Sequence, residues 1–382
     1  MRWVLWLTLS LILSGCATAK DDAAPRIASQ NTMAEKVYIV GQDLDALRGY
    51  ISSDCCLWPD GTTAYLSLYG LREAPDFGGL GYDLDGMIVS PEASWGAGAV
   101  GAYQTVNEFG ATDLAIGLYI AENGNPDGLR RIANGEFDAE ILRLSEMMKT
   151  VPGQVYLRIG YEFDGAWNTG QENTDNFIAA YRKIVDVIRA DGVTNSVFVW
   201  QASGSILDDL IEKKHEDISL WYPGDDYVDW LALSWFSKPE AMPTIPGSYR
   251  PKRPIDLANE VVAMARQLNK PVLIAESAPQ GYDIAAKFRA NINPLLDGPS
   301  GENIHHLSSA EIWQEWYVPL FDWMDVNNDV VRGLAYINVD WDSQPMWGPP
   351  YANGFWGDSR LQENSELADR FDQSVATWKA KP

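Results

Sequence analysis

Short apolar segments alternate with amphipathic segments along most of the chain. The apolar segments are rich in β-branched residues and end in polar or glycine-containing turns, which is typical of buried strands. The amphipathic segments carry apolar residues three and four positions apart, which predicts helices. The clearest helix is 174–192, with Thr174 as its cap and Gly192 at its end. A glycine- and aromatic-rich stretch that contains 64–71 follows the first strand. The predicted strands are 37–43, 85–90, 113–120, 154–162, 196–203, 227–236, 271–277 and 331–341.

Eight strands with helices between most of them predict a parallel sheet, because parallel strands need crossover connections. Eight such units in roughly 300 residues fit a single-domain (β/α)8 TIM barrel. An open doubly wound sheet is the main alternative, but no G-x-G-x-x-G follows the first strand. A barrel brings the C-terminal ends of all strands to one face. The residues at these ends are Asp43, Glu92, Glu122, Glu162, Gln201, Trp235, Glu276 and Trp341.

Two of these ends carry the carboxylates that we regard as the candidate catalytic pair. Glu162 closes the fourth strand and Glu276 the seventh, and these strands face each other across the mouth of a barrel. Glycoside hydrolysis needs two such groups, one to protonate the leaving oxygen and one to attack the anomeric carbon or activate water. The aromatic content agrees, since 16 Trp and 17 Tyr suit a protein that stacks sugar rings.

The net charge of the chain restricts the classes of molecule that it is expected to bind. A formal net charge of −24 disfavours nucleic acid, anionic membranes and polyanionic substrates, so a neutral polysaccharide or oligosaccharide is expected. The three histidines lack zinc spacing. A segment that opens like a calcium loop at Asp325 has Val330 in place of the required glycine and Tyr336 in place of the closing glutamate. No metal and no cofactor is therefore expected.

The first residues predict a targeting segment. Residues 1–15 hold a basic residue and an apolar run too short to span a bilayer comfortably. The run ends in LSGC, which resembles a bacterial lipobox with Cys16 as the lipidated residue, and Ala17 resembles the signal for outer-membrane sorting. Residues 16–35 would form a flexible tether, and 36–382 the catalytic domain, whose membrane contact is only through the lipid anchor. An ordinary cleaved signal with a chance cysteine is the alternative.

Cys55 and Cys56 would then face an oxidising compartment. Neighbouring Cα atoms lie about 3.8 Å apart, which is below the usual range for a disulfide. Two buried thiols and a strained vicinal disulfide both remain open.

Three segments resemble one enzyme family. The segment 133–167, which ends in YLRIGYEFDGAW, resembles the acid/base region of glycoside hydrolase family 26, a clan A family of (β/α)8 barrels that includes β-mannanases. The segment 221–236 resembles the family's Y-P-G-D-x-Y-V-D stretch, and 270–277 resembles the strand that delivers its nucleophile. The resemblance implies a retaining enzyme with Glu162 as acid/base and Glu276 as nucleophile.

The chain departs from the family pattern beside this chemistry. Tyr161 stands where the family has His, Asp164 where it has Asn, and Phe236 where it has a Tyr that hydrogen-bonds the nucleophile. Phenylalanine has no hydroxyl, so that contact is lost unless Tyr161 supplies another. We therefore expect a distant member or a sister family and do not assume mannanase activity.

The remaining candidates are residues that bind substrate. Arg158 lies on the strand of Glu162 and could hold Glu276 ionised or form only a structural ion pair. Trp341 matches the clan's habit of a tryptophan beneath the sugar at the cleavage point. The other predicted substrate contacts are Tyr161, Trp167 and Trp235.

The resulting expectation is a lipid-anchored, monomeric, endo-acting glycosidase for a mannan-, xylan- or glucan-like polysaccharide. A non-catalytic glycan-binding lipoprotein on the same barrel is the alternative, and it would keep the aromatic residues while losing the acid/base geometry. A barrel enzyme for phosphate-bearing or metal-bound substrates lacks the basic site and the ligands.

Overall fold

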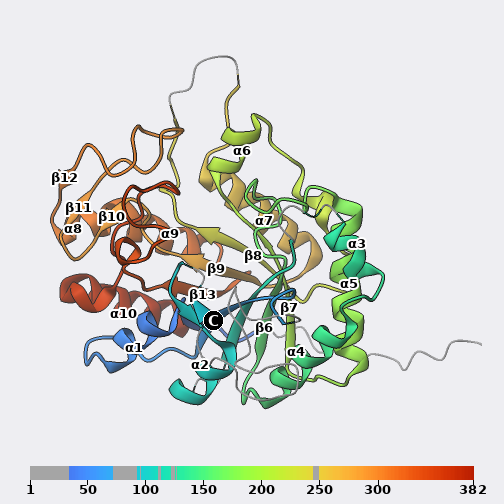
Figure 1. Ribbon diagram of the computed structural model, residues 1–382. Helices are drawn as coiled ribbons and strands as arrows, with labels where there is room; N and C mark the ends of the chain where they lie inside the picture. The colour runs from blue at the N-terminus through green and yellow to red at the C-terminus, as the bar shows by residue number, and fades with distance from the viewer. Residues whose placement is uncertain are drawn as a thin grey trace, which may run out of the picture. The chain divides into compact units, whose positions relative to one another are not determined.

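Eight parallel strands close into a barrel in the computed structural model, which describes residues 34–71, 93–94, 96–110, 113–121, 125, 127–243 and 249–382 (Figure 1). Each strand pairs with the next along the chain, and the last pairs with the first. The predicted (β/α)8 barrel is confirmed, and an open doubly wound sheet is excluded. The barrel strands are β1 (Val37–Gly41), β2 (Gly61–Ser67), β5 (Asp113–Tyr119), β6 (Val155–Ile159), β7 (Ser196–Ala202), β8 (Trp230–Trp235), β9 (Val272–Ser277) and β13 (Val331–Ile337).

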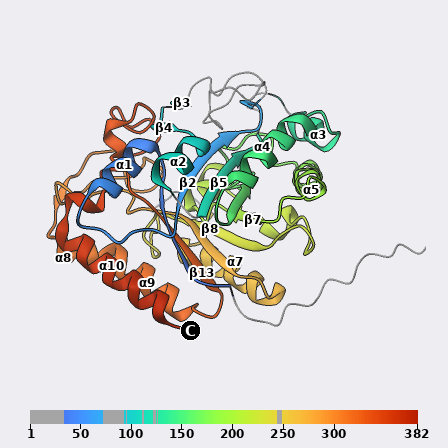
Figure 2. The same cartoon turned by 90° about the horizontal axis from the view of Figure 1, so that it is seen from below.

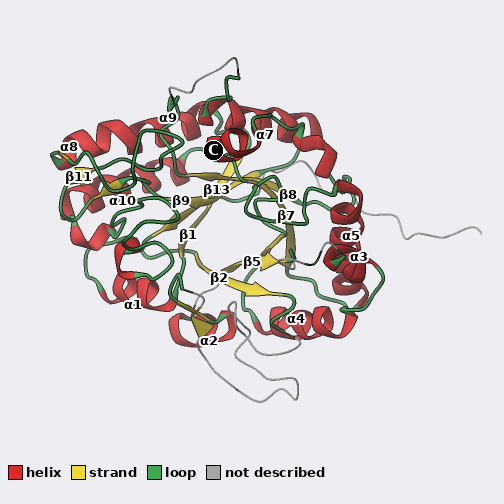
Figure 3. Ribbon diagram, turned by 45° about the horizontal axis from the view of Figure 1, so that its top comes forward, coloured by secondary structure: helices red, strands yellow, loops and turns green. Residues whose placement is uncertain are grey.

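Helices surround the barrel on its outside (Figures 2 and 3). Their apolar residues pack against the outward side chains of the strands and form the larger buried core. The α-helices are α1 (Leu44–Ser52), α2 (Ala102–Phe109), α3 (Gly128–Ala133), α4 (Asp138–Thr150), α5 (Thr174–Ala190), α6 (Ile206–Glu212), α7 (Pro254–Leu268), α8 (Ser309–Ile312), α9 (Val318–Val326) and α10 (Ser365–Ala380). None of the helices in the described ranges combines the length and the apolar character that a membrane span requires.

Short helices and strands lie in the loops that connect the barrel strands and the main helices. The 3-10 helices are η1 (Ile218–Trp221), η3 (Trp341–Ser343) and η4 (Leu361–Glu363), and the π-helix is η2 (Trp313–Tyr317). The short strands form the antiparallel pair β3 (Ala93–Ser94) and β4 (Ala99–Val100), and the antiparallel sheet of β10 (Tyr282–Asp283), β11 (Phe288–Arg289) and β12 (His305–His306).

The second strand of the barrel lies earlier than the sequence predicts. β2 falls in the glycine- and aromatic-rich stretch and pairs with both β1 and β5. The assignment of 85–90 as the second strand is therefore wrong, and those residues lie outside the described ones. At the start of α5, Asn173 rather than Thr174 is the cap, because its side chain accepts a hydrogen bond from the Asn176 amide at 3.0 Å.

A second buried cluster fills the inside of the barrel. Its largest members are Tyr156 and Trp230, whose rings meet edge to face with centroids 5.3 Å apart. Small and β-branched residues from the other strands fill the space around them. This cluster consists of Val37, Ile39, Ala115, Tyr156, Val199, Trp230, Ala232, Leu273, Ala275 and Ala335.

The residues from Ala34 to Pro382 form one compact unit. Cys55 and Cys56 lie between α1 and β2, and the structure joins them by a disulfide. Of the two alternatives that the sequence leaves open, the structure therefore has the bonded pair. The candidate lipidation residue Cys16 lies outside the described residues.

Candidate active site

Four polar side chains from adjacent strands meet inside the barrel near its C-terminal mouth. Arg158 comes from β6, Gln201 from β7, Ser234 from β8 and Glu276 from β9, and all four are buried. We call these four residues the polar layer. Side chains two residues apart point to the same side of a strand, so three of the four continue the inward faces of Tyr156, Val199 and Ala232.

Glu276 points inward because β9 contains an irregularity. Leu233 of β8 pairs with Ile274, but Ser234 pairs with Glu276, so Ala275 is an extra residue in β9. A strict alternation from the inward Leu273 would send Glu276 to the outer side of the sheet. A bulge re-aims a side chain in this way, and here it brings the carboxylate to the level of Ser234.

The Glu276 carboxylate forms an ion pair with the fully buried guanidinium of Arg158. The rings of Tyr65 and Tyr161 flank the same guanidinium, with their centroids 4.9 and 5.4 Å from its carbon. Gly117 of β5 makes room for this arrangement, because a Cβ there would lie 2.6 Å from the Tyr65 ring and 2.9 Å from an Arg158 nitrogen. These contacts fix the position of the Glu276 carboxylate beside a positive charge.

Glu162 lies three residues beyond the end of β6, in a loop rather than at the strand end that the sequence predicts. Its φ of 52° lies in the left-handed region, which costs a non-glycine residue about 1–3 kcal/mol. Two donors hold this backbone in place. The Glu162 carbonyl accepts from the Gly165 amide at 2.9 Å and from the Asn168 side-chain amide at 2.8 Å.

Each oxygen of the Glu162 carboxyl accepts one hydrogen bond. The Ser234 hydroxyl donates to Oε1 at 2.6 Å, and the Trp167 indole donates to Oε2 at 3.0 Å. Burial, followed by the negative charge of Glu276, raises the pKa of Glu162 to about 8, against the effect of both hydrogen bonds. Glu162 therefore carries a proton at neutral pH, as a general acid requires.

Two aspartates connect the loop of Glu162 to the loop that follows β7. Asp164, in the first loop, accepts from the Ser203 amide in the second at 2.6 Å. Asp208, at the start of α6, accepts from the Ala166 amide in the first loop at 2.7 Å. Burial, followed by the charge of Asp164, raises the pKa of Asp208 to about 8. The two loops are thus fixed to each other by reciprocal bonds.

The structure places three predicted substrate contacts beside or near this site. Trp167 is 42% exposed and contacts Glu162, so much of its ring is open to a ligand. Tyr161 is half-buried against Arg158 and the edge of Tyr65. Trp341 begins η3, four residues beyond the end of β13 and not at the strand end. It is only 3% exposed and packs against other tryptophans, which are Trp347 and Trp356.

The prediction of a sugar-stacking role for Trp235 is wrong. Trp235 follows the inward Ser234 and therefore points outward, where it is buried against Trp323 of α9, with ring centroids 5.1 Å apart. Its neighbour Phe236 packs against Trp356. Asp43 is also structural, since it caps α1 by accepting from the amides of two residues in the first turn.

Sequence reasoning missed Ser234 and Asp208 altogether. For Ser234 a signal exists, because it is the polar residue two positions after Ala232 at the end of a buried strand. No local pattern distinguishes Asp208 from an ordinary acidic residue in the first turn of a helix. Glu92 and Glu122, which the sequence places at strand ends, lie outside the described residues.

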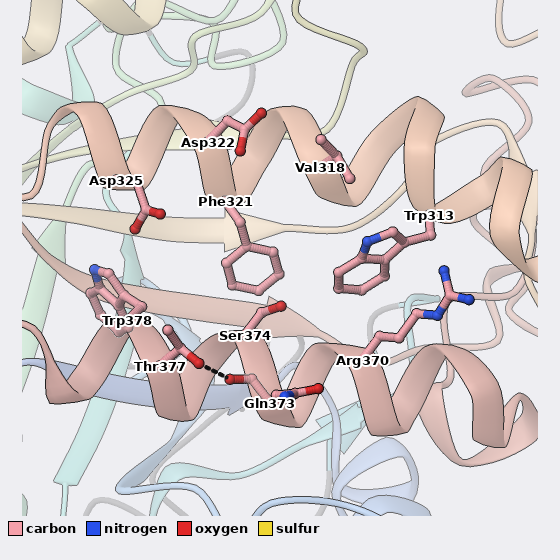
Figure 4. A pocket seen from close by; sticks show the side chains of 10 residues that line it. All are labelled: Trp313, Val318, Phe321, Asp322, Asp325, Arg370, Gln373, Ser374, Thr377 and Trp378. Atoms are coloured by element: carbon pink, nitrogen blue, oxygen red, sulfur yellow. Dashed lines mark hydrogen bonds between the residues drawn. The ribbon is translucent and has the colours of Figure 1, made fainter.

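Two other hollows lie away from the carboxyl pair. One of about 410 Å³ lies between α9 and α10, where Phe321 and Trp313 face Arg370 and Thr377 (Figure 4). Another, of about 850 Å³, lies at the opposite end of the barrel and is lined by residues at the starts of strands. Within the described ranges, no three His, Cys, Asp or Glu side chains come together as metal ligands.

A protonated carboxyl and an ion-paired carboxylate at the mouth of a (β/α)8 barrel are the arrangement found in glycoside hydrolases of this fold. The family model "Glycosyl hydrolase family 26" matches residues 130–294, which include both glutamates. Over this segment the chain is similar to glycosyl hydrolase family 26, the family that its sequence motifs resemble.

The chain is also similar to individual proteins. The chain is 32% identical over 338 residues to a protein of Vibrio sp named beta-1,3-xylanase TXYA, covering 88% of the chain and 64% of that protein. It is 32% identical over 324 residues to a beta-1,3-xylanase of Alcaligenes sp, covering 85% of the chain and 60% of the relative. The chain thus spans less than two thirds of either relative. A solved family 26 β-mannanase of Bacteroides ovatus has the same fold, with a TM-score of 0.50 and 13% identity over 90% of this chain and 89% of that one.

Proposed function

We propose that the protein is a retaining glycoside hydrolase that cleaves β-glycosidic bonds within a polysaccharide, with Glu162 as acid/base and Glu276 as nucleophile. One observation carries the proposal. The two carboxyl groups share a connected set of hydrogen bonds, yet their surroundings differ, because Glu276 is ion-paired with Arg158, whereas desolvation and then the negative charge of Glu276 raise the pKa of Glu162.

In the proposed first step, Glu162 gives its proton to the glycosidic oxygen while Glu276 attacks the anomeric carbon. The C–O bond to the leaving sugar breaks, and a glycosyl ester forms on Glu276. The ester carries no charge, so the second cause of the raised pKa of Glu162, the negative charge of Glu276, disappears, while the effect of burial remains. In the second step, the ionised Glu162 takes a proton from water, which attacks the ester and releases a sugar of retained configuration.

We propose a β-1,3-linked xylan as the first substrate to test, on the strength of the two relatives that bear the name beta-1,3-xylanase. The formal net charge of −24 is compatible with a neutral xylan. Endo action is part of the proposal.

The test is hydrolysis of a polysaccharide panel by a soluble form that starts at residue 34. The panel holds β-1,3-xylan, β-1,4-xylan, β-mannan, β-1,3-glucan and one charged polysaccharide. The highest kcat/KM is expected on β-1,3-xylan, with oligosaccharides as early products. Faster cleavage of another neutral polymer would reject the substrate and keep the mechanism. Binding without cleavage of any polymer would favour the glycan-binding lipoprotein.

We also propose that Cys16 is lipidated and holds the enzyme at the cell envelope, in the outer membrane. The support for this proposal is the sequence LSGC that ends at Cys16, followed by Ala17. Action as a monomer stays a prediction.

A further inference from the structure

Gln201 lies at the centre of the polar layer, and its amide orientation follows from its neighbours. Arg158 Nη1 lies 3.1 Å from Gln201 Oε1, and a guanidinium only donates hydrogen bonds. The amide oxygen of Gln201 therefore faces Arg158. The Gln201 NH2 group must face the other way, where Ser234 Oγ lies at 3.1 Å and a Glu276 oxygen at 3.4 Å.

This orientation fixes the hydroxyl of Ser234. Gln201 Nε2 has no free lone pair and can only donate, so Ser234 Oγ accepts from it. A hydroxyl has one proton, and Ser234 directs it to Glu162 Oε1 at 2.6 Å. Both side chains are buried, at 0% and 4% exposure, so solvent has little room to rearrange these bonds.

We infer that Arg158, Gln201 and Ser234 form a directed chain of hydrogen bonds that keeps Glu162 Oε1 unprotonated and places the catalytic proton on Oε2. This inference rests on the proposed role of Glu162 as acid/base. Ser234 and Gln201 act through Glu162 and are positioning residues.

The opposite arrangement fails for lack of an acceptor. With the proton on Oε1, Ser234 Oγ would accept from both Glu162 and Gln201, and its own proton would need a third partner. Among the described residues, the Ser234 hydroxyl contacts no further acceptor. A buried hydroxyl proton without a partner costs about 1–3 kcal/mol.

Oε2 is free to carry the proton. The Trp167 indole donates to it at 3.0 Å, and a protonated carboxyl oxygen can still accept one hydrogen bond. Trp167 is 42% exposed, so Oε2 is the carboxyl oxygen that contacts a side chain open to solvent. The series of hydrogen bonds therefore places the acid proton on the oxygen that faces the space where a sugar can enter.

Neutron diffraction on the soluble protein at about pH 6 is the direct test, and it needs no turnover. Deuterium is expected on Glu162 Oε2 and on Ser234 Oγ in the direction of Oε1. Deuterium on Oε1 would overturn the inference. The result does not depend on the substrate, so failure here is distinguishable from failure of the proposed hydrolase activity.

A titration provides the second test. Ser234→Ala removes a hydrogen bond that stabilises the ionised Glu162, so its pKa is expected to rise by about one unit. The measurement is the ¹³C shift of the glutamate carboxyl carbons against pH, with the Glu162 signal identified by its absence in Glu162→Gln. Ser234→Thr keeps the hydroxyl and should return the titration to that of the wild type.

The matched control is Ser309→Ala. Ser309 is also buried and donates to a side-chain oxygen, that of Asn364 at 3.2 Å, but it lies in α8. Its removal should cost similar stability and leave the Glu162 titration unchanged. An unchanged titration in Ser234→Ala, or a shift of equal size in the control, would reduce Ser234 to a structural role.

Discussion

The two glutamates differ in environment and in proposed role, so replacing each one should block a different step of the reaction. Glu276→Ala removes the proposed nucleophile, so no glycosyl-enzyme should form. Glu162→Ala removes the proton donor, which matters little when the substrate is an aryl glycoside with a good leaving group. Such a substrate should therefore still form the intermediate, which then persists because no base activates water.

Added azide separates the two variants. Azide needs no base, so Glu162→Ala should turn over again and yield a glycosyl azide of retained configuration. In Glu276→Ala, azide can only attack the substrate directly and give the inverted product. Mass spectrometry and NMR of the azide adducts distinguish these outcomes. Inverted product from the wild-type enzyme would contradict the assignment of both residues.

In the proposed mechanism, the protonation of Glu162 sets the alkaline limit of activity. Catalysis requires the protonated form, whose pKa is about 8 because of burial and the nearby charge of Glu276. We expect kcat/KM on a natural polysaccharide to fall as pH rises through about 8, tenfold for each further pH unit. An activated aryl glycoside, which needs little acid assistance, should show a weaker fall in its first step. A decline on the polysaccharide as pH rises through about 5, with little change on the aryl glycoside, would mean that Glu162 ionises as an ordinary carboxyl.

Among the elements, the two loops after β6 and β7 act as one unit. Asp208 supports the loop of Glu162 through a single bond to the Ala166 amide. We expect Asp208→Ala to lower kcat about tenfold or more, because the acid loses its position and the Ala166 amide loses its partner. Asp208→Asn keeps an accepting oxygen and should stay within about threefold of the wild type.

Comparison of Asp208→Ala with Asp208→Asn separates the effect of the hydrogen bond to Ala166 from the effect of the Asp208 charge. Steady-state kinetics and thermal melting check it together, with Asp45→Ala on the exposed side of α1 as a control for loss of an acidic side chain. A large loss of activity in Asp208→Asn would show that the charge, rather than the bond to Ala166, is what matters.

The order of strands and helices was largely predictable from the sequence. Apolar residues repeat every two positions in a strand and every three to four in a helix, and both spacings follow from local backbone geometry. Glu162 and Glu276 could be found for the same reason, since the barrel brings strand ends together. The prediction for Trp235 failed because the side of the sheet that a side chain faces depends on the register of its strand, and a shift by one residue moves the side chain to the other side. Ser234 and Asp208 act through partners 72 and 42 positions away along the chain, and such contacts leave no local signature.

At the scale of the whole molecule, the proposed lipid anchor lies outside the compact unit that contains the barrel. Cys16 precedes the compact unit that begins at Ala34, so its replacement should leave folding and activity unchanged. Cys16→Ala is expected to move the protein from the membrane fraction to the soluble fraction, as judged by fractionation and immunoblotting. Metabolic labelling with a tagged fatty acid should lose its signal in the same variant. Continued sedimentation with membranes would reject the lipid anchor.

The ion pair of Arg158 and Glu276 links the proposed catalytic role of Glu276 to the stability of the folded protein, and this link limits the order in which the two residues can be lost in evolution. Removing Glu276 leaves a fully buried guanidinium without its partner, a change that costs about 3–5 kcal/mol. A lineage that loses the nucleophile first therefore also loses much of its folded protein. Glu276→Ala should melt at a lower temperature than the wild type, and the additional change Arg158→Met should recover much of the loss. Descent from this enzyme to an inactive sugar receptor is thus expected to begin at Arg158.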